Sequence, residues 1–309
     1  MTLVSVVVPV YHEVESVPRL HQALVKMADA TSGTWELLFV DDGSTDGTWE
    51  ALREAQAGDP RVRAIRLARN FGQTAAMACG IAAARGGIIV TMDGDLQNDP
   101  ADIPRLLATL DEGYDVVCGW RHERQDKLWT RKIPSMIANR LIGWLTGVRL
   151  HDYGCSLKAY RAGVIKRTPL YAQFHRFIPA LATLTGALIA ELKVSHHPRR
   201  FGTTKYTLSR TWRVALDMVT VSLLVKFASR PLRLFGVLAV GCAGLAAVGV
   251  IRSWESYAGP SQTIPQILPA VSALSAWLAG HLLVVGLLAE LCLSTTHIRP
   301  SDLIASTER

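Results

Sequence analysis

The N-terminal part of the chain alternates short apolar runs with longer segments of helical periodicity. The apolar runs predict strands at residues 3–10, 35–42, 62–68, 87–93 and 114–120. Amphipathic patterns between them predict helices at residues 16–30, 46–56, 72–84 and 100–113. Strands of near-continuous Val, Ile and Leu that alternate with helices are typical of a mostly parallel sheet with helices on both faces. We therefore predict an α/β domain of this kind.

The C-terminal part of the chain has a different pattern. An uncharged run of 18 residues extends from Leu234 to Ile251, and no Asp, Glu, Lys or Arg occurs from Ser256 to Ala289. A helix needs about 20 apolar residues to cross a bilayer. Two buried core helices are the alternative, but two such runs so close together favour a transmembrane hairpin, with spans at about 232–252 and 267–289.

The charges around the hairpin predict its orientation. The loop at 253–266 contains no Lys or Arg, whereas the segments before Leu234 are rich in both. By the positive-inside rule the loop lies outside, and the N-terminal domain and both termini lie in the cytoplasm. We therefore expect a multi-pass protein of the inner (plasma) membrane.

The charge and cysteine content of the chain indicate which kinds of partner it can have. A net charge of +7 and a pI near 9.3 suit a protein that rests on an anionic membrane surface. Nucleic acid is the competing partner for a basic chain, but the apolar tail leads us to expect none. The five cysteines form no C-x-x-C pair, so we expect neither disulfides nor zinc. Because Met1 leads straight into a strand pattern, we also expect no signal peptide.

Two basic, aromatic segments with helical spacing precede the hairpin, at 121–150 and 208–228. Buried core helices are one interpretation, but the mixture of Trp, Leu, Arg and Lys favours helices that lie in the membrane interface. We predict a cytoplasmic domain at 1–207, an interfacial amphipathic helix at 208–231, and the hairpin with a short cytoplasmic tail at 232–309.

The segment TMDGDLQNDP, residues 91–100, places acidic residues directly after a predicted buried strand. Asp93 and Asp95 point to the same side of an extended strand end, where their charges repel. Mg²⁺ or Mn²⁺ would resolve that repulsion, with Gln97 adding a neutral oxygen. The alternative is a solvated acidic turn closed by Pro100, because D-x-D alone often occurs by chance.

The other polar strand ends support a ligand site. PVYHE, DDGSTD and DGDLQ all follow predicted strands, and ligands of parallel sheets bind at the carboxyl ends of strands. Neither the dinucleotide fingerprint G-x-G-x-x-G nor a P-loop occurs in the chain. A nucleotide would therefore bind through acidic and aromatic side chains and a metal ion.

Six motifs occur in a characteristic order: VVVPVYHE, VDDGSTDGT, RNFGQTAAM, DGDLQNDP, DYGCSLKAYR and RRFGTTKY. With two membrane spans after them, they resemble the family 2 glycosyltransferases of GT-A fold across the whole chain. The similarity is to the polyprenyl-phosphate branch, which includes dolichyl-phosphate mannose synthase, bactoprenol glucosyltransferases and undecaprenyl-phosphate aminoarabinose transferase.

The resemblance implies a donor site at the ends of the first strands. It implies that the nucleoside of a nucleotide sugar is held by Pro9, Tyr11, Glu13, Val40 and Asp42. Carboxylates can accept hydrogen bonds from a base N–H and from ribose hydroxyls. For Asp46, in DDGSTDGT, we favour the alternative role of helix capping.

The resemblance also implies the reacting centre. The metal ion is bound by Asp93, Asp95 and Gln97, and Gly94 lies in the same donor site. There the ion acts as a Lewis acid on the departing nucleoside diphosphate, which makes Asp95 and Gln97 catalytic.

The acceptor is implied to be a lipid phosphate, bound by Arg121, Arg131, Arg199 and Lys205. Asp152 corresponds to an aspartate often assigned as general base. A phosphate monoester already carries about −1.5 to −2 charges at pH 7, so Asp152 could instead position the sugar or the segment after it.

The predicted activity is metal-dependent, inverting transfer of one sugar from a UDP- or GDP-linked donor to undecaprenyl or dolichyl phosphate. The product would serve cell-envelope glycan or lipid modification through a downstream flippase or glycosyltransferase, and relatives suggest a homotetramer. One alternative is a processive polysaccharide synthase, although the chain lacks Q-x-x-R-W and further spans. The other is a non-catalytic lipid-binding scaffold, which would have no use for the carboxylate pair.

Overall fold

The structure is a computed structural model. It describes residues 2–122, 140, 142–143, 147–168, 170, 174–183, 186–198, 220, 227, 230–258 and 267–295. The chain divides into two compact units, Met1–Val225 and Lys226–Arg309, which are described separately. Most of the predicted interfacial segments, 121–150 and 208–228, lie outside the described residues.

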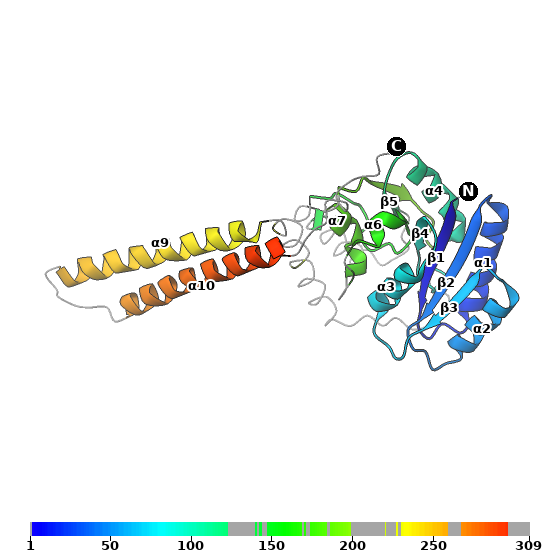
Figure 1. The fold of residues 1–309 in the computed structure, drawn as a ribbon, viewed down its shortest axis with the longest axis horizontal. Coiled ribbons are helices and arrows are strands. Elements are labelled where there is room, and N and C mark those ends of the chain that lie inside the picture. The colour runs from blue at the N-terminus through cyan, green and yellow to red at the C-terminus, as the bar shows by residue number, and fades with distance from the viewer. Residues whose placement is uncertain are drawn as a thin grey trace. The chain divides into compact units, whose positions relative to one another are not determined.

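The first unit is built on a 7-stranded sheet in the order β3-β2-β1-β4-β6-β5-β7 (Figure 1). The strands are β1 Leu3–Val10, β2 Thr34–Asp41, β3 Val62–Arg66, β4 Ile88–Thr91, β5 Val116–Trp120, β6 Lys158–Arg161 and β7 Ile189–Lys193. Strands β1 to β4 pair in parallel, as do β5 and β7. Strand β6 runs antiparallel between β4 and β5. The predicted mostly parallel sheet is thus confirmed, with one reversed strand that the pattern did not predict.

Helices cover both faces of this sheet. The described helices of the unit are α1 Ser16–Ala30, α2 Thr48–Gly58, α3 Gln73–Ala83, α4 Ile103–Asp111, α6 Ala162–Ile165 and α7 Ile178–Ala182, with short 3-10 turns η1 Pro100–Asp102 and η3 Phe174–Arg176. Successive side chains of a strand point to opposite faces. Val6 and Val8 of β1 accordingly belong to the core shared with α1, α2 and α4. Val7 between them belongs to the core shared with α3, α6 and α7.

The second unit holds two long helices, α9 Pro231–Ala258 and α10 Ile267–Thr295. Both are long and apolar enough to cross a membrane, judged by length and composition. Large apolar side chains such as Val240 and Trp277 are exposed along them. Exposure of this kind fits a lipid environment better than the interior of a soluble domain.

The two helices pack closely because small residues lie between them. A Cβ on Gly249 of α9 would stand 2.1 Å from Ser272 Oγ of α10, and one on Gly286 would stand 2.8 Å from Phe235 Cβ. Small residues allow this approach of helix backbones in membranes. At the start of α9, the carboxylate of Glu290 accepts the backbone N–H of Leu232 at 3.3 Å, which satisfies a donor that has no partner within the helix. The predicted spans therefore correspond to two helices, each longer than predicted; the domain boundaries stay predictions.

Candidate active site

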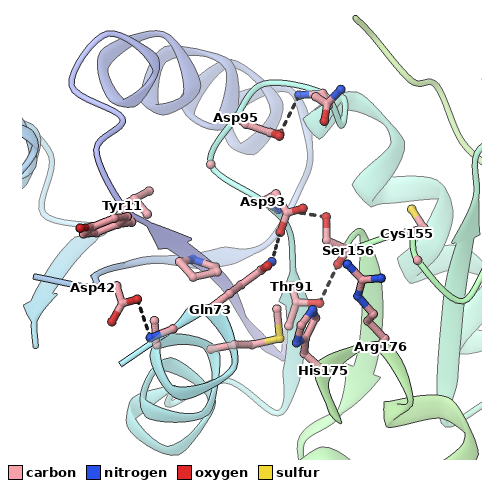
Figure 2. A pocket seen from close by; sticks show the side chains of 18 of the residues that line it. Tyr11, Asp42, Gln73, Thr91, Asp93, Asp95, Cys155, Ser156, His175 and Arg176 are labelled. Carbon is pink, nitrogen blue, oxygen red and sulfur yellow. Dashed lines mark hydrogen bonds between the residues drawn. The ribbon is translucent and has the colours of Figure 1, made fainter. Parts of the chain in front are cut away.

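A cavity of about 510 Å³ lies at the carboxyl ends of β1, β2 and β4 (Figure 2). Because β6 is antiparallel, the segment that leads into it reaches the same edge of the sheet. Residues 153–156 and Lys158 therefore form part of the wall opposite the ends of β1 and β2. His175 and Arg176 of η3 line the cavity as well.

Most of the predicted donor-site residues meet in this cavity. Its lining includes Pro9, Tyr11, Glu13, Asp42, Asp93, Gly94, Asp95, Gln97 and Arg121. Val40 is fully buried in β2 and does not line it. Its side chain faces α3, where a Cβ on Gly80 would come within 3.0 Å of it. Arg131, Arg199 and Lys205 lie outside the described residues.

The loop after β1 is fastened to the loop after β2. The backbone N–H groups of His12 and Glu13 donate to Ser44 Oγ at 3.0 Å and to Thr48 Oγ1 at 2.9 Å. His12 has a φ of 55°, a left-handed conformation that is uncommon outside glycine, and its ring stacks on that of Tyr11 at 4.0 Å. The stacked rings of Tyr11 and His12 both line the cavity, and uncommon backbone conformations of this kind cluster at binding sites.

The acidic loop after β2 has structural contacts as well as a face in the cavity. The two carboxylate oxygens of Asp42 accept the backbone N–H groups of Phe71 and Gly72, each at 2.8 Å, and so hold the chain entering α3. Asp46 accepts the backbone N–H of Thr48, the first residue of α2, at 3.2 Å. Asp46 therefore contacts the first residue of α2, but Gly47 occupies the N-cap position, and the capping role of Asp46 stays a prediction.

The carboxylate pair after β4 lies in the middle of the cavity wall (Figure 2). Gly94 permits this position, because a Cβ there would stand 2.6 Å from Val10 Cγ1. Asp93 accepts a hydrogen bond from Gln73 Nε2 at 2.6 Å, and Asp95 accepts the N–H of Gln97 at 3.2 Å.

The environment of Asp93 disfavours its charge. Burial, and then the neighbouring charge of Asp95, raise the pKa of the Asp93 carboxyl from 3.8 to about 6. A hydrogen bond with Ser156 and the positive charges of Arg121 and Arg176 lower it without cancelling the rise. Two crowded carboxylates facing a cavity have the electrostatic character of a cation-binding site.

The donor set fits Mg²⁺ or Mn²⁺. Asp93, Asp95 and Gln97 offer hard oxygen ligands, which both ions prefer. Within the described residues, no group of three or more His, Cys, Asp or Glu side chains is placed to hold a metal. The protein would therefore supply only part of the shell, as is usual for Mg²⁺ at a phosphate-binding site, and water and phosphate oxygens would complete it.

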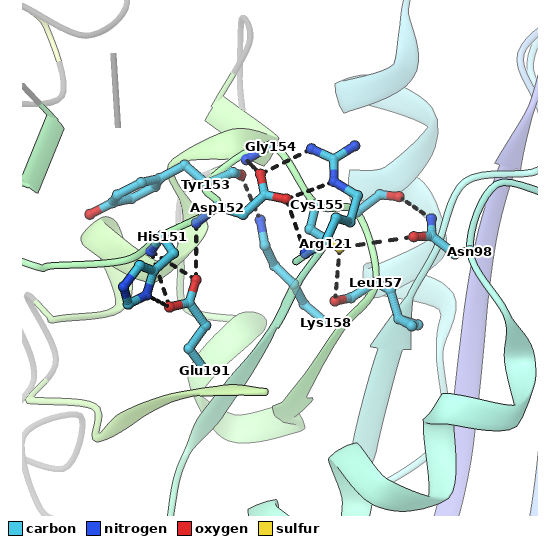
Figure 3. A network of polar contacts seen from close by, with 11 residues as sticks. Asn98, Arg121, His151, Asp152, Tyr153, Gly154, Cys155, Leu157, Lys158 and Glu191 are labelled. Atoms are coloured by element: carbon cyan, nitrogen blue, oxygen red, sulfur yellow. Dashed lines mark hydrogen bonds and ion pairs between the residues drawn. The ribbon is translucent and has the colours of Figure 1, made fainter. Parts of the chain in front are cut away.

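Asp152 lies behind the cavity and makes an ion pair with Arg121 (Figure 3). Arg121 Nε donates to Asp152 Oδ2 at 2.6 Å, and Nη2 donates to Oδ1 at 2.9 Å. The N–H of Gly154 donates to Oδ1 at 3.0 Å as well. Only 2% of the surface of Asp152 is exposed, and both of its carboxylate oxygens accept hydrogen bonds. This geometry suits a residue that fixes the position of the Arg121 guanidinium.

A second carboxylate holds the backbone that carries Asp152 (Figure 3). Glu191 on β7 accepts the N–H of His151 at 2.9 Å, the N–H of Asp152 at 3.0 Å and the His151 ring nitrogen at 2.7 Å. The His151 ring also stacks on Trp120 at 4.2 Å. Through these contacts β7 fixes the segment that positions the ion pair.

Several residues of the cavity were not predicted individually. Gln73 and Ser156 belong to two of the quoted motifs, but nothing in the sequence shows that both contact Asp93. His175 and Arg176 carry no sequence signal. His175 is buried, and its Nδ1 shares a hydrogen bond of 2.6 Å with Thr74 Oγ1 of α3. The two residues are about a hundred positions apart in the sequence.

Comparison with known proteins places this cavity in context. The chain matches the family described as Glycosyl transferase family 2 over residues 5–169. It is 48% identical over 246 residues to the dodecaprenyl-phosphate galacturonate synthase of Rhizobium johnstonii, which covers 78% of this chain and 73% of that protein. It is 37% identical over 292 residues to the undecaprenyl-phosphate 4-deoxy-4-formamido-L-arabinose transferase of Salmonella choleraesuis, which covers 93% of this chain and 87% of that protein.

Solved structures share the fold. The glucosyl-3-phosphoglycerate synthase of Mycobacterium tuberculosis, in complex with Mn²⁺, uridine diphosphate and glucosyl-3-phosphoglycerate, superposes with a TM-score of 0.57 at 18% identity, over 72% of this chain and 79% of that one. At this identity the likeness concerns the fold alone, and it confirms the predicted GT-A architecture. The family match and the two relatives show more: this chain is a glycosyltransferase and belongs to glycosyl transferase family 2.

Proposed function

We propose that the enzyme transfers one sugar from a nucleotide sugar to a polyprenyl phosphate at a membrane, with a divalent cation and inversion at the anomeric carbon. The names of the two relatives support the lipid phosphate as acceptor. The apolar helices α9 and α10 support a lipid substrate, since a soluble acceptor needs no membrane anchor. The predicted inner-membrane location, the cytoplasmic catalytic unit and the homotetramer are part of this proposal.

The observation that carries the proposal is the Asp93–Asp95 pair in the middle of the cavity. Tyr11 and Asp42 lie on one side of it, where the resemblance expects the nucleoside. The pair would bind Mg²⁺ or Mn²⁺ together with Gln97, beside the diphosphate of the donor. When bound, the ion supplies Lewis-acid stabilisation of the departing nucleoside diphosphate.

The chain's own residues orient the reactants. Gln73 holds the Asp93 carboxylate, and Asp152 holds the Arg121 guanidinium at the cavity wall. Inversion needs a single displacement, in which a phosphate oxygen of the acceptor attacks from the face opposite the diphosphate. That oxygen is already negative at neutral pH, so no protein base has to remove a proton. Asp152 therefore acts as a positioning residue in this scheme.

The acceptor contacts and the product's use extend the proposal. Arg121 would meet the acceptor phosphate from the described part of the chain, and Arg131, Arg199 and Lys205 remain predicted phosphate ligands. The lipid-linked sugar would be consumed by a flippase or by a second glycosyltransferase of the cell envelope.

A transfer assay tests the proposal. Full-length protein in detergent is incubated with Mg²⁺ or Mn²⁺, undecaprenyl phosphate, and a panel of UDP- and GDP-linked sugars. We expect a lipid product that carries one sugar, detected by mass spectrometry, and no product with undecaprenol, which lacks the phosphate. A chelator should abolish the product. A lipid that gains several sugars, or donors that are only hydrolysed, would show that the proposal is wrong.

A further inference from the structure

The half of the cavity opposite the nucleoside side carries a positive charge, Arg176, that has no ion-pair partner among the residues that the structure describes. Figure 2 shows Tyr11 and Asp42 on one side of Asp93, and His175 and Arg176 on the other. A nucleotide sugar that places its nucleoside near Tyr11 and its diphosphate near Asp93 directs its sugar toward Arg176. The proposed function assigns no part of either substrate to that far side.

Arg176 differs from Arg121, the other arginine of the lining, in its contacts. The guanidinium of Arg121 is engaged by the carboxylate of Asp152 through two hydrogen bonds. The guanidinium of Arg176 makes no hydrogen bond and no ion pair with any residue that the structure describes. Its positive charge lowers the pKa of Asp93, although no ion pair joins the two side chains.

The turn that carries Arg176 is rigidly anchored. Phe174 and Phe177 on either side are buried, with 1% of their surface exposed, and pack in a common apolar cluster. His175 is tied to Thr74 by its 2.6 Å hydrogen bond. Arg176 is the only partly exposed residue from Phe174 to Ala182, and it lines the cavity. The backbone that carries Arg176 is therefore held at the cavity wall before any substrate binds.

Charge balance indicates what Arg176 contacts. A divalent cation at Asp93 and Asp95 neutralises both carboxylates, which leaves Arg176 without a protein counter-charge. Hydroxyl groups of a neutral sugar could accept hydrogen bonds from the guanidinium but would give it no direct ion-pair partner in a partly desolvated site. A carboxylate matches the guanidinium in charge and in two-pronged geometry.

We propose that Arg176 binds the carboxylate of the donor sugar, and that the donor is therefore a nucleotide-linked uronic acid. This inference rests on the proposed function for the placement of the donor in the cavity, and it adds the chemical class of the sugar. Arg176 is then the residue that separates uronic acids from the corresponding neutral hexoses.

Equilibrium binding with matched donors tests this inference. UDP-galacturonate and UDP-galactose differ only in the carboxylate at C6, and GDP-mannuronate and GDP-mannose form a second pair. Dissociation constants are measured by calorimetry on full-length protein in detergent with Mn²⁺ and no lipid acceptor. We expect the uronate of one pair to bind about 10- to 150-fold more tightly than its hexose, the range for a charge-assisted contact.

Variants assign the preference to Arg176. Arg176→Met should remove the preference while leaving the affinity for the neutral hexose and for the free nucleotide unchanged. Arg176→Lys should keep part of it, because the charge remains and the second hydrogen bond is lost. Arg53→Met, at an exposed position on α2, is the matched control and should behave as wild type. Retained nucleotide binding shows that each variant is folded.

Two results would overturn the inference. One is equal binding of uronate and hexose by the wild type in both pairs. The other is an equal loss of free-nucleotide affinity in Arg176→Met, which would assign the arginine to the diphosphate. Because no acceptor is present, these outcomes are independent of the lipid. If the protein binds the uronate selectively but transfers nothing to undecaprenyl phosphate, the proposed acceptor is wrong while the inferred class of sugar stands.

Discussion

Replacing Asp95 by Asn should stabilise the metal-free protein at neutral pH while disabling transfer. Asp93 has its pKa raised from 3.8 to about 6, first by burial and then by the charge of Asp95. In the folded state Asp93 therefore binds a proton more readily than in the unfolded state. Stability rises as the pH falls through about 6 toward 4 and is lost as the pH rises again.

The size of the expected stabilisation follows from the pKa shift of Asp93. A difference of about 2 pKa units corresponds to about 3 kcal/mol of unfolding free energy at neutral pH. Asp95 is the second cause after burial, so removing its charge should recover part of this free energy, on the order of 1 kcal/mol. For a unit of this size, that is a rise of about 2–4 °C in melting temperature. The gain should disappear below about pH 5, where Asp93 is protonated in the wild type as well.

The assay is thermal unfolding in detergent with a chelator, across this pH range, followed by intrinsic fluorescence. The informative quantity is the difference in melting temperature between Asp95→Asn and wild type, because the contributions of the other acidic groups are the same in both proteins. Asp111→Asn, at an exposed residue that ends α4, is the matched control. Transfer by Asp95→Asn should fall by about a hundredfold or more, because the diphosphate loses its Lewis acid. A variant that is less stable at neutral pH and transfers normally would show that the acidic segment is only a turn.

Two further predictions concern other parts of the chain. Asp152→Asn should lower the stability by about 3 kcal/mol, because Arg121 loses a buried partner, and Arg121→Met in the same chain should restore stability but not transfer. A general base would show instead as lost turnover at unchanged stability in the single variant. Ser256→Cys, in a chain without other cysteines, should react with an impermeant thiol reagent in intact cells, because residues 253–266, which include the end of α9, carry no Lys or Arg. Labelling only after lysis would reverse the predicted topology.

The sequence predicted the elements whose burial follows a simple period. Helix α1 has its predicted bounds, residues 16–30, because its apolar residues recur on one face. Strands β1, β2 and β4 are near-continuous apolar runs, which only a sheet covered on both faces can bury. The position of the Asp93–Asp95 pair followed from the same pattern, because the carboxyl ends of parallel strands share one edge of the sheet. The apolar helices α9 and α10 were evident from length and composition.

The tertiary structure decided which distant residues meet. Strand β6 has only four residues, too few for a period, and its antiparallel insertion between β4 and β5 brings Ser156 to Asp93. The pairing of Asp152 with Arg121 and the placement of Arg176 in the cavity likewise join separate segments. Local periodicity records whether a side chain is buried, but it carries no information about its partner. For a charged group the partner decides which roles are open: Asp152 is paired with Arg121, whereas Arg176 has no ion-pair partner among the described residues.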